Sequence, residues 1–450
     1  MKDLIQKVES GNAIIGILGM GYVGLPLAIS FAKRFNVLGF DVNQVLINNL
    51  QHGKSYISDV SPEDIDRVLG QSFCPTTDSS KLKDCDFLII CVPTPLTKDK
   101  KPDLSYIKGA CEIISGFLNK GQFVILESTT YPGTTDEIVV PMLEVSKLKA
   151  GKDFGVAFSP ERIDPGNKDY TIDKIPKVVG GINKECTKIA ALLYASIISE
   201  VICVSDAKTA ESVKMVENVF RNVNIALVNE LALIFENMGI NCWEVIDAAS
   251  TKPYGYTPFY PGPGVGGHCI PLDPFYLSYQ AKRYGIMPRF IETSAEINDF
   301  MKVHVVNLIR NGLNRENKKI FGSKIVIMGL AYKRNIEDVR ESPSKDVIEE
   351  LISLGANIAV FDPFVTSIKT DVGEFFSEAS IRDAFREADC VVFVTDHEIF
   401  KKIDLFEVGV EDSLPIIIDC RNIFEKCNGY TLLGIGRGDI NNTPIYKNSN

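Results

Sequence analysis

The residue with the most evident chemistry in this chain is Cys269, which lies on a glycine-rich segment. The segment reads GPGVGGHCIPLDP from Gly262 onward and places Asp273 four residues after the cysteine. Asp273 and Pro274 precede an apolar-periodic stretch, Phe275–Tyr284, which predicts a helix capped by Asp273 with Pro274 at its first position. Backbone N–H groups and the helix dipole at such an end favour negative charge and lower the pKa of a nearby thiol. We therefore predict that Cys269 is a nucleophile.

The alternative for Cys269 is that it is a small buried apolar residue, as most free cysteines are. The chain has eleven cysteines. Six lie in or beside apolar runs and are expected to be structural: Cys85, Cys91, Cys111, Cys203, Cys390 and Cys420. The nucleotide-binding features described below favour the nucleophile for Cys269.

Length and composition limit the possible classes of protein. A chain of 450 residues is too long for one ordinary core, so two or three domains are expected. No apolar run approaches the roughly 18 residues of a membrane span, and residues 1–11 lack the apolar core of a secretory signal. The net charge of −10 argues against nucleic-acid binding. The cysteines show no paired spacing, which indicates a reducing cytoplasm rather than a disulfide framework. The sequence contains no Cys-x-x-Cys pair or His cluster that would indicate a metal site.

A dinucleotide-binding pattern stands near the start of the chain. An apolar strand, Ala13–Leu18, is followed by the G-x-G-x-x-G run Gly19, Met20, Gly21, Tyr22, Val23 and Gly24. A helical pattern, Leu25–Arg34, and a second strand, Val37–Phe40, lead to Asp41. Glycines at these places let a pyrophosphate reach the helix N-terminus, and the acid accepts hydrogen bonds from ribose hydroxyls. Because an acid repels a 2′-phosphate, the pattern predicts NAD rather than NADP.

Three further strands end in residues that could bind a ligand. They are expected at Asp86–Val92, Gln122–Glu127 and Gly155–Phe158. The carboxyl ends of strands in a parallel sheet are where ligands bind, so Thr94 and Thr129 are candidate cofactor contacts. Either threonine could instead cap a following helix. Glu161 and Arg162 place an acid and a base at the end of the third strand.

The longest uninterrupted helical pattern runs from Asp206 to Gly239. Lys214, Asn218 and Arg221 fall at i, i+4 and i+7 and therefore share one face. Their neighbours are mostly apolar, so these polar groups need partners, which a substrate or a second subunit could supply. The helix is also a plausible dimerisation element.

A second α/β region begins near Ser323. Its strands are expected at Lys324–Met328, Asn357–Phe361, Cys390–Val394 and Ile416–Asp419. No second G-x-G-x-x-G follows, so this region should bind a different nucleotide or nucleotide-like group. Four basic residues stand at strand ends or nearby loops and suggest a diphosphate site: Lys333, Arg334, Arg340 and Arg421.

Taken in order, the motifs resemble those of the nucleotide-sugar 6-dehydrogenase family, which includes UDP-glucose, UDP-N-acetylhexosamine and GDP-mannose dehydrogenases. The resemblance covers about residues 14–424. It rests on the glycine run, Val92 to Pro95, Glu127 to Thr129, Pro160 to Arg162, Lys214 to Asn218, Gly266 to Cys269, and Gly329 to Ser342.

The resemblance implies an α/β fold with two Rossmann-like, doubly wound parallel-sheet domains joined by a long central helix and a helical dimerisation region. The implied divisions are an NAD-binding domain (1–205), a central helical domain with the cysteine loop (206–310) and a UDP-sugar-binding domain (311–450). It further implies a homo-oligomer, at least a dimer, that acts on a UDP-sugar and binds neither nucleic acid nor membrane.

The family converts a sugar C6 alcohol to a carboxylate with two NAD+ and one water. By resemblance, Cys269 forms a thiohemiacetal and then a thioester, Lys214, Asn218 and Asp273 stabilise the oxyanion or handle protons, and Glu161 assists hydrolysis. The implied cofactor contacts are Gly19, Gly21, Tyr22, Val23, Gly24, Asp41, Thr94, Thr129 and Arg340. The implied substrate contacts are Arg162, Ile163, Lys214, Asn218, Arg221, Gly266, Lys333 and Arg421.

The sugar is indicated by two further features. His268 stands where UDP-glucose enzymes usually carry serine, which favours the branch that handles N-acetylated sugars. The stretch Ser250–Pro261 resembles UDP-N-acetylglucosamine 6-dehydrogenases of bacterial surface-polysaccharide pathways. UDP-N-acetylgalactosamine, UDP-N-acetylmannosamine and UDP-glucose remain alternative substrates. A two-electron alcohol dehydrogenase and a nucleotide-sugar-binding protein without turnover are the alternatives outside this chemistry.

Overall fold

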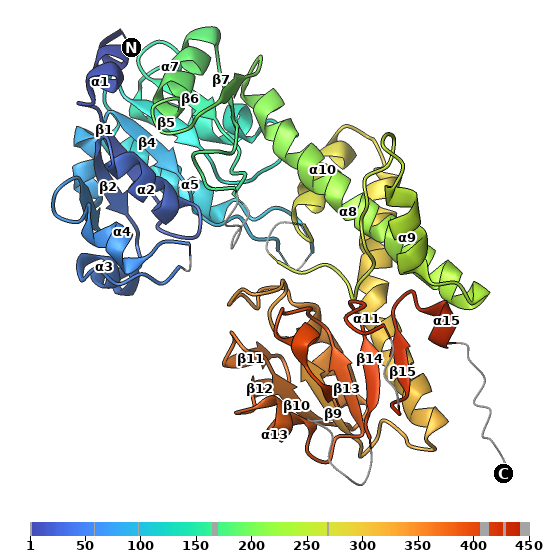
Figure 1. The fold of residues 1–450 in the computed structure, drawn as a ribbon. Helices are drawn as coiled ribbons and strands as arrows, with labels where there is room; N and C mark the ends of the chain where they lie inside the picture. Colours follow the sequence, from blue (N-terminus) through green and yellow to red (C-terminus); the bar gives the residue numbers. More distant parts are fainter. Residues whose placement is uncertain are drawn as a thin grey trace, which may run out of the picture. The chain divides into compact units, whose positions relative to one another are not determined.

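A computed structural model of the chain describes residues 2–57, 59–97, 99–163, 170–267, 270–405, 414–425 and 429–441 (Figure 1). The chain divides into two compact units. The first comprises Met1–Glu217 and Phe275–Met287, and the second comprises Asn218–Pro274 and Pro288–Asn450.

The first unit is built on a sheet whose described strands follow the order β3-β2-β1-β4-β5-β6-β7-β8. Neighbouring strands pair in parallel, except that β6 and β7 are antiparallel. The strands are β1 (Ile14–Leu18), β2 (Asn36–Phe40), β3 (Phe73–Thr76), β4 (Phe87–Ile90), β5 (Phe123–Leu126), β6 (Gly155–Phe158), β7 (Lys177–Gly181) and β8 (Val201–Cys203). The order 3-2-1-4-5-6 is that of a dinucleotide-binding fold, so the predicted fold of this region is confirmed.

Apolar runs explain these strands, because β4, β5 and β6 are buried along their whole length. Helices α1 (Lys2–Ser10), α2 (Gly24–Ala32) and α7 (Lys184–Tyr194) contribute to one core cluster, and α5 (Ser105–Phe117) contributes to another. Shorter elements are α3 (Gln44–Gln51), α4 (Pro62–Asp66), η1 (Ser79–Asp84), η2 (Thr135–Val139), α6 (Val140–Leu143) and η3 (Glu144–Ser146).

The second unit contains a parallel sheet whose described strands follow the order β10-β9-β13-β14-β15, drawn in orange and red in Figure 1. These strands are β9 (Lys324–Met328), β10 (Asn357–Phe361), β13 (Cys390–Phe393), β14 (Ile416–Asp419) and β15 (Leu432–Gly434). An antiparallel hairpin joins β11 (Ser367–Thr370) to β12 (Gly373–Phe376). The helices are α9 (Cys242–Ser250), α11 (Arg289–Arg315), α12 (Pro343–Ser353), α13 (Ile381–Phe385), η4 (Phe400–Lys402) and α15 (Gly438–Asn441).

The predicted long helix is present as α8, Ala207–Met238. It ends before Gly239, whose φ of +75° is the left-handed conformation that glycine adopts most readily after a helix. The helix predicted after Asp273 is α10, Asp273–Arg283, which begins one residue earlier than predicted, with Asp273 as its first residue rather than its cap and Pro274 as its second. The structure therefore supplies the predicted long central helix and two mainly parallel sheets, the first of which contains one antiparallel pair, β6 and β7.

One of the six cysteines expected to be structural is not buried. Cys203 is exposed, because β8 is the edge strand of its sheet, whereas Cys85, Cys91, Cys111, Cys390 and Cys420 are buried as expected. Burial raises the pKa of the Cys85 and Cys111 thiols to about 12 in each case, so both remain neutral thiols.

A buried carboxylate, Glu211, joins the start of α8 to the segment after β5. It accepts hydrogen bonds from the Gly133 N–H (2.5 Å), the Thr135 N–H (2.8 Å) and the Thr135 hydroxyl (2.6 Å). Burial raises the pKa of Glu211 to about 7, although these hydrogen bonds act in the opposite direction. The free energy of unfolding should therefore depend on pH through Glu211.

We expect Glu211→Gln to flatten the dependence of stability on pH. In the unfolded chain the carboxyl loses its proton near its ordinary pKa of 4.5, whereas the folded protein retains it until about pH 7. The folded state therefore binds more protons in this window, and its stability falls as the pH rises. Thermal unfolding midpoints at pH 5 and pH 8 should differ by less in Glu211→Gln than in the wild type.

The exposed Glu9→Gln variant on α1 is the control and should keep the slope of the wild type. An unchanged slope in Glu211→Gln would contradict the prediction.

Candidate active site

The glycine run after β1 forms a tight loop with open space beside Gly21. Gly19 has a φ of +98°, donates its N–H to the Phe40 carbonyl (2.8 Å), and leaves no room for a Cβ, which would lie 2.5 Å from the Cys91 carbonyl oxygen. A Cβ on Gly24 would lie 1.8 Å from the Gly19 carbonyl oxygen. A Cβ on Gly21 would meet no described atom within 4 Å. Two glycines are thus required by packing, while the third leaves open space where a phosphate can approach the backbone.

The N-terminus of α2 faces this space without a side-chain cap. Its N-cap residue, Val23, makes no side-chain capping hydrogen bond. The Leu25 N–H already donates to the Gly21 carbonyl (3.1 Å) and Pro26 has no N–H, so an anion would be favoured here by the Gly24 N–H and the helix dipole. Asp41, at the end of β2, is half-buried and accepts hydrogen bonds from the Met20 N–H (2.8 Å) and the Asn43 N–H (2.8 Å). These two bonds orient the carboxylate beside the glycine run, and Val42 next to it is 76% exposed. The residues therefore fit a dinucleotide whose ribose hydroxyls bind Asp41.

Thr94 and Thr129 lie on loops that helix α10 holds. The Tyr276 hydroxyl donates to the Thr94 carbonyl (2.5 Å), and the Gln280 amide donates to the Pro132 carbonyl (2.8 Å). Neither threonine caps a helix, because the next helical elements begin after Leu104 and Thr134. The capping alternative is therefore wrong for both residues, which leaves their role as cofactor contacts a prediction.

Two adjacent residues after β6 form ion pairs with α8. The Lys214 ammonium donates to the Glu161 carbonyl (2.8 Å) and lies 3.4 Å from its carboxylate, with both residues buried. The Arg162 guanidinium pairs with Glu217 (2.7 Å) and also donates to the Pro176 carbonyl (2.5 Å). Glu161 in addition accepts the Ile163 N–H. An acid and an ammonium are thereby held together at the carboxyl end of a parallel strand.

Within the second unit, two predicted site residues contact each other. The Asn218 side-chain amide donates to the Asp273 carboxylate (2.5 Å), and both residues are buried. Asn222, one turn further along α8, donates to the Ile270 carbonyl (3.2 Å). The nucleophile itself, Cys269, lies outside the described residues, as does His268.

The glycines before the cysteine pack against the loop that follows β9. The Gly267 N–H donates to the Arg340 carbonyl (3.0 Å). A Cβ on Gly266 would lie 2.7 Å from the Tyr332 Cβ and 2.8 Å from the Glu341 carbonyl oxygen. The predicted substrate and cofactor contacts Gly266 and Arg340 are therefore neighbours in this unit.

The predicted cluster of basic residues is accompanied by acids. Arg340 forms a bidentate contact with Asp338 at 2.6–3.1 Å, and Arg334 pairs with Asp396. The Arg421 side chain donates to the Val394 carbonyl (3.1 Å) and passes Gly262, where a Cβ would lie 2.5 Å from its guanidinium. Lys333 is half-buried on the same loop as Arg334, and Arg221 is exposed on α8.

Three acids of this region were missed in the sequence: Glu211, Glu217 and Asp338. The first two lie within two turns of Lys214 on α8, where the only sequence signal is a charged residue inside a largely apolar helix. Asp338 lies two residues before Arg340, a spacing too common to indicate an ion pair. The partners of Glu211 and Glu217 come from distant segments, so spacing along the chain does not reveal them.

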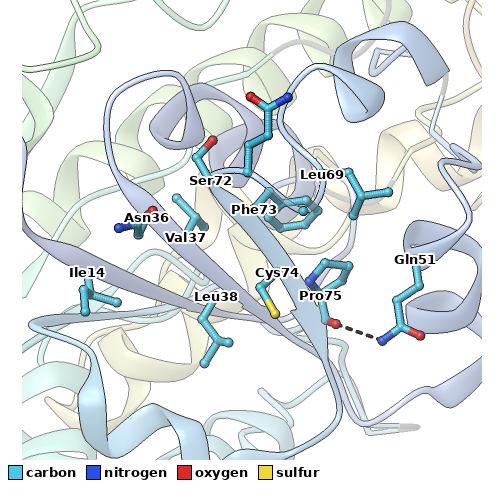
Figure 2. A pocket seen from close by; sticks show the side chains of 12 residues that line it. Ile14, Asn36, Val37, Leu38, Gln51, Leu69, Ser72, Phe73, Cys74 and Pro75 are labelled. Carbon is cyan, nitrogen blue, oxygen red and sulfur yellow. Dashed lines mark hydrogen bonds between the residues drawn. The ribbon is translucent and has the colours of Figure 1, made fainter.

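A hollow of about 560 Å³ lies elsewhere in the first unit, at the edge strand β3 (Figure 2). Its lining includes Ile14 and Asn36, the first residues of β1 and β2. Leu38 and Cys74 face it from paired positions on β2 and β3, and Gln51 donates to the Pro75 carbonyl (3.0 Å) at its side. Because ligands of this fold bind at the carboxyl ends of the strands, the hollow is not the dinucleotide site.

Comparison with known proteins matches three successive regions of the chain to one family. The NAD-binding domain of the UDP-glucose/GDP-mannose dehydrogenase family matches residues 13–198, its central domain matches 208–300 and its UDP-binding domain matches 326–426. No helix among the described residues is long and apolar enough to cross a membrane.

Individual relatives agree with the family match. The UDP-N-acetyl-D-glucosamine 6-dehydrogenase of Pseudomonas aeruginosa is 40% identical over 355 residues, 78% of this chain and 83% of that protein. The UDP-N-acetyl-D-mannosamine dehydrogenase of Pyrococcus horikoshii is 37% identical over 434 residues, 95% of this chain and 100% of that protein. A solved structure of the UDP-D-ManNAc dehydrogenase from Pyrococcus horikoshii aligns with a TM-score of 0.89 at 35% identity, covering 95% of this chain and 100% of that one. The chain therefore belongs to the UDP-glucose/GDP-mannose dehydrogenase family and is an NAD-dependent nucleotide-sugar dehydrogenase.

Proposed function

We propose that the protein oxidises the C6 hydroxymethyl group of UDP-N-acetylglucosamine to the uronate in four electrons. The observation that carries the proposal is the set of contacts on α8, which holds Lys214 against Glu161 and Asn218 against Asp273. The proposal balances as one alcohol, two NAD+ and one water giving one carboxylate, two NADH and three protons.

In the first oxidation the C6 hydroxyl proton passes to the Asp273 carboxylate, and the oxyanion that develops must be stabilised. NAD+, when bound, accepts the hydride from C6. The Lys214 ammonium and the Asn218 amide donate to the developing oxyanion, because both can direct N–H groups at it. Asp273 orients the Asn218 amide through their hydrogen bond. The product at this stage is a C6 aldehyde.

The second oxidation runs through Cys269. Its thiolate adds to the aldehyde carbon and forms a thiohemiacetal, which loses a hydride and becomes a thioester. Covalent attachment prevents the aldehyde from leaving. Water then attacks the thioester carbon, and the cysteine leaves as thiolate; Glu161 assists by positioning this water and taking its proton.

The ligand contacts are assigned as the family resemblance implies. We assign NAD to Gly19, Gly21, Tyr22, Val23, Gly24, Asp41, Thr94, Thr129 and Arg340. We assign the UDP-sugar to Arg162, Ile163, Lys214, Asn218, Arg221, Gly266, Lys333 and Arg421. The acids that accompany Arg340 and Arg162 keep the guanidinium groups in place until an anionic ligand competes for them.

The choice of sugar rests on His268, on the stretch Ser250–Pro261 and on the similarity to the Pseudomonas aeruginosa enzyme. The similarity to UDP-N-acetyl-D-mannosamine dehydrogenase supports that substrate as the second candidate. A protein that binds without turnover would not need the Lys214–Glu161 pair. We further propose that the enzyme acts in the cytoplasm and supplies uronates for surface polysaccharide.

A homodimer is the assembly that the surface of α8 supports. Phe220, Leu227 and Ile234 recur every seven residues and are 54%, 50% and 47% exposed, which places an apolar stripe on one side of the helix. Phe300 and Val303 on α11 are also exposed apolar residues. Apolar stripes of this kind are favoured in interfaces between subunits, so we propose that α8 is the dimerisation element.

Cys269→Ser should abolish uronate formation, lowering NADH production by more than about a hundredfold. A serine hydroxyl is a much weaker nucleophile than a thiolate. NAD binding, measured by calorimetry, should remain near that of the wild type because the glycine run is unchanged. Cys203→Ser, at an exposed cysteine of β8, is the control and should retain full activity. A fully active Cys269→Ser variant would rule out the thioester route.

The substrate is tested by counting NADH formed per sugar consumed with UDP-N-acetylglucosamine, its galacto epimer, UDP-N-acetylmannosamine and UDP-glucose. We expect two NADH per sugar, with the highest kcat/KM for UDP-N-acetylglucosamine. One NADH and an aldehyde product would point to the two-electron alternative. A higher kcat/KM for another sugar would leave the four-electron mechanism in place and refute UDP-N-acetylglucosamine as the preferred substrate.

Leu227→Glu should dissociate the dimer, because a carboxylate at the centre of the apolar stripe would be buried without a partner. Light scattering after size exclusion should show a halved mass at low micromolar concentration. Lys369→Glu introduces the same acid at an exposed position of the β11–β12 hairpin and should leave the mass unchanged. An unchanged mass in Leu227→Glu would remove the α8 stripe as the interface.

A further inference from the structure

A fully buried histidine and aspartate lie at the carboxyl end of the sheet in the second unit. Asp362 directly follows β10, and His397 stands four residues after β13. Both side chains are 0% exposed, and His397 Nε2 lies 3.0 Å from the Asp362 carboxylate. The family match does not give this pair a role.

The hydrogen bonds of His397 determine its tautomer. The Asn335 backbone N–H lies 2.9 Å from Nδ1 and can only donate, so Nδ1 is an acceptor without a proton. The proton of the neutral ring is then on Nε2, which donates to Asp362. Phe364 and Phe400 pack against the ring, each with a centroid distance of 5.2 Å, and hold its orientation. The ring joins Asp362 to the Asn335 backbone.

Asp362 is a rigid support for this bond. One carboxylate oxygen also accepts the Leu330 N–H (2.6 Å) and the Ala331 N–H (3.0 Å). The other accepts the Phe364 N–H (2.8 Å) and the Val365 N–H (3.0 Å). Although burial acts to raise the pKa of Asp362, the hydrogen bond from His397 and those from the backbone outweigh it, and the pKa is lowered. The carboxylate is ionised and tied to the start of the loop after β9.

The loop that His397 contacts carries residues of the proposed site. It runs from Tyr332 to Glu341, includes Lys333 and Arg340, and turns at Asn335, whose φ is +58°. Asparagine tolerates this left-handed backbone better than most residues, so the turn itself is not strained. Two bonds to the segment after β13 fix its position: the Asn335 N–H donates to His397 (2.9 Å), and the Asn335 side-chain oxygen accepts the Glu398 N–H (3.1 Å).

The same loop supports the segment before the nucleophile. The Arg340 carbonyl accepts the Gly267 N–H, and Tyr332 and Glu341 pack against Gly266. A shift of the loop would therefore displace the substrate contacts and the backbone two residues before Cys269 together.

We propose that His397, as its Nε2–H tautomer, is a positioning residue that holds the 332–341 loop in place through the Asn335 N–H. It thereby aligns the UDP-sugar contacts with the cysteine segment. The inference rests on the proposed function, because that function places Lys333, Arg340 and Cys269 in the site.

Two substitutions separate this role from a general contribution to the core. In His397→Asn, the side-chain oxygen is close to the place of Nδ1 and can accept the Asn335 N–H, while the donor to Asp362 is lost. In His397→Gln, the amide nitrogen is close to the place of Nε2 and can donate to Asp362, while the acceptor for the loop is lost. Asp362 keeps four backbone donors in either variant.

We expect His397→Gln to raise the KM for the UDP-sugar and lower kcat, with kcat/KM falling roughly tenfold for the loss of a buried hydrogen bond. His397→Asn should restore most of this loss. The KM for NAD should change less than the KM for the UDP-sugar, because Arg340 is the one assigned NAD contact on this loop, whereas the glycine run and Asp41 are untouched. His52→Asn, at an exposed histidine of the first unit, is the control and should leave all constants unchanged.

The tautomer has its own readout. The chain has four histidines, so the ring-nitrogen NMR signals of His397 are assigned by their loss in His397→Gln. We expect one pyridine-like Nδ1 and one protonated Nε2. A protonated Nδ1 would overturn the inference. Wild-type kinetic constants in both variants would also overturn the inference. So would a fall in kcat/KM in His397→Asn at least as large as that in His397→Gln, when the two variants have equal thermal stability.

A failure of the proposed function can be told apart from a failure of the inference about His397. If the wild type forms no NADH from any UDP-sugar, the function is refuted. The inference is then decided by the NMR signals and by calorimetry with UDP alone, for which His397→Gln should bind more weakly than His397→Asn. Equal UDP affinity of the two variants would overturn it.

Discussion

The pairing of buried charges along α8 is the constraint on which the site depends. A buried polar or charged group without a partner is costly, so α8 can bury Glu211 only where hydrogen-bond donors meet it and Lys214 only where an acid meets it. Glu211 meets backbone and hydroxyl donors after β5, and Lys214 meets Glu161 after β6. A rotation of the helix by one residue would leave both groups unpaired. The charges therefore set the register of α8 against the sheet, and with it the direction in which Lys214 faces.

The two sheets use an acid at the end of their second strand in different ways. Gly19 and Gly329 both take a positive φ and donate their N–H to the last residue of that strand, Phe40 or Phe361. Asp41 accepts two backbone N–H groups and remains half-buried, which suits a ribose. Asp362 accepts four backbone N–H groups and His397, and is fully buried. The same architecture thus presents a ligand-binding acid in one unit and a structural acid in the other.

Much of the fold could be predicted from local patterns. Apolar runs bounded by glycine or charged residues indicated β1, β2, β4, β5 and β6, because strands buried on both faces need continuous apolar sequence. Edge elements were harder. β8 has only three residues and is largely exposed, and β15 is equally short, so neither carries a distinctive pattern. For this reason the sequence did not reveal that Cys203 is exposed, since its apolar neighbours do not indicate that their strand is at an edge.

The sequence by itself determined the glycine run with Asp41, the long helix and the presence of Cys269, because each depends on residues that are close together in the chain. Only the tertiary structure decided that Glu161 meets Lys214, that neither Thr94 nor Thr129 caps a helix, and that His397 joins Asp362 to the Asn335 turn. The contacts of Lys214 and His397 join segments separated by tens of residues. Their geometry follows from how strands and helices pack, which spacing along a chain does not encode.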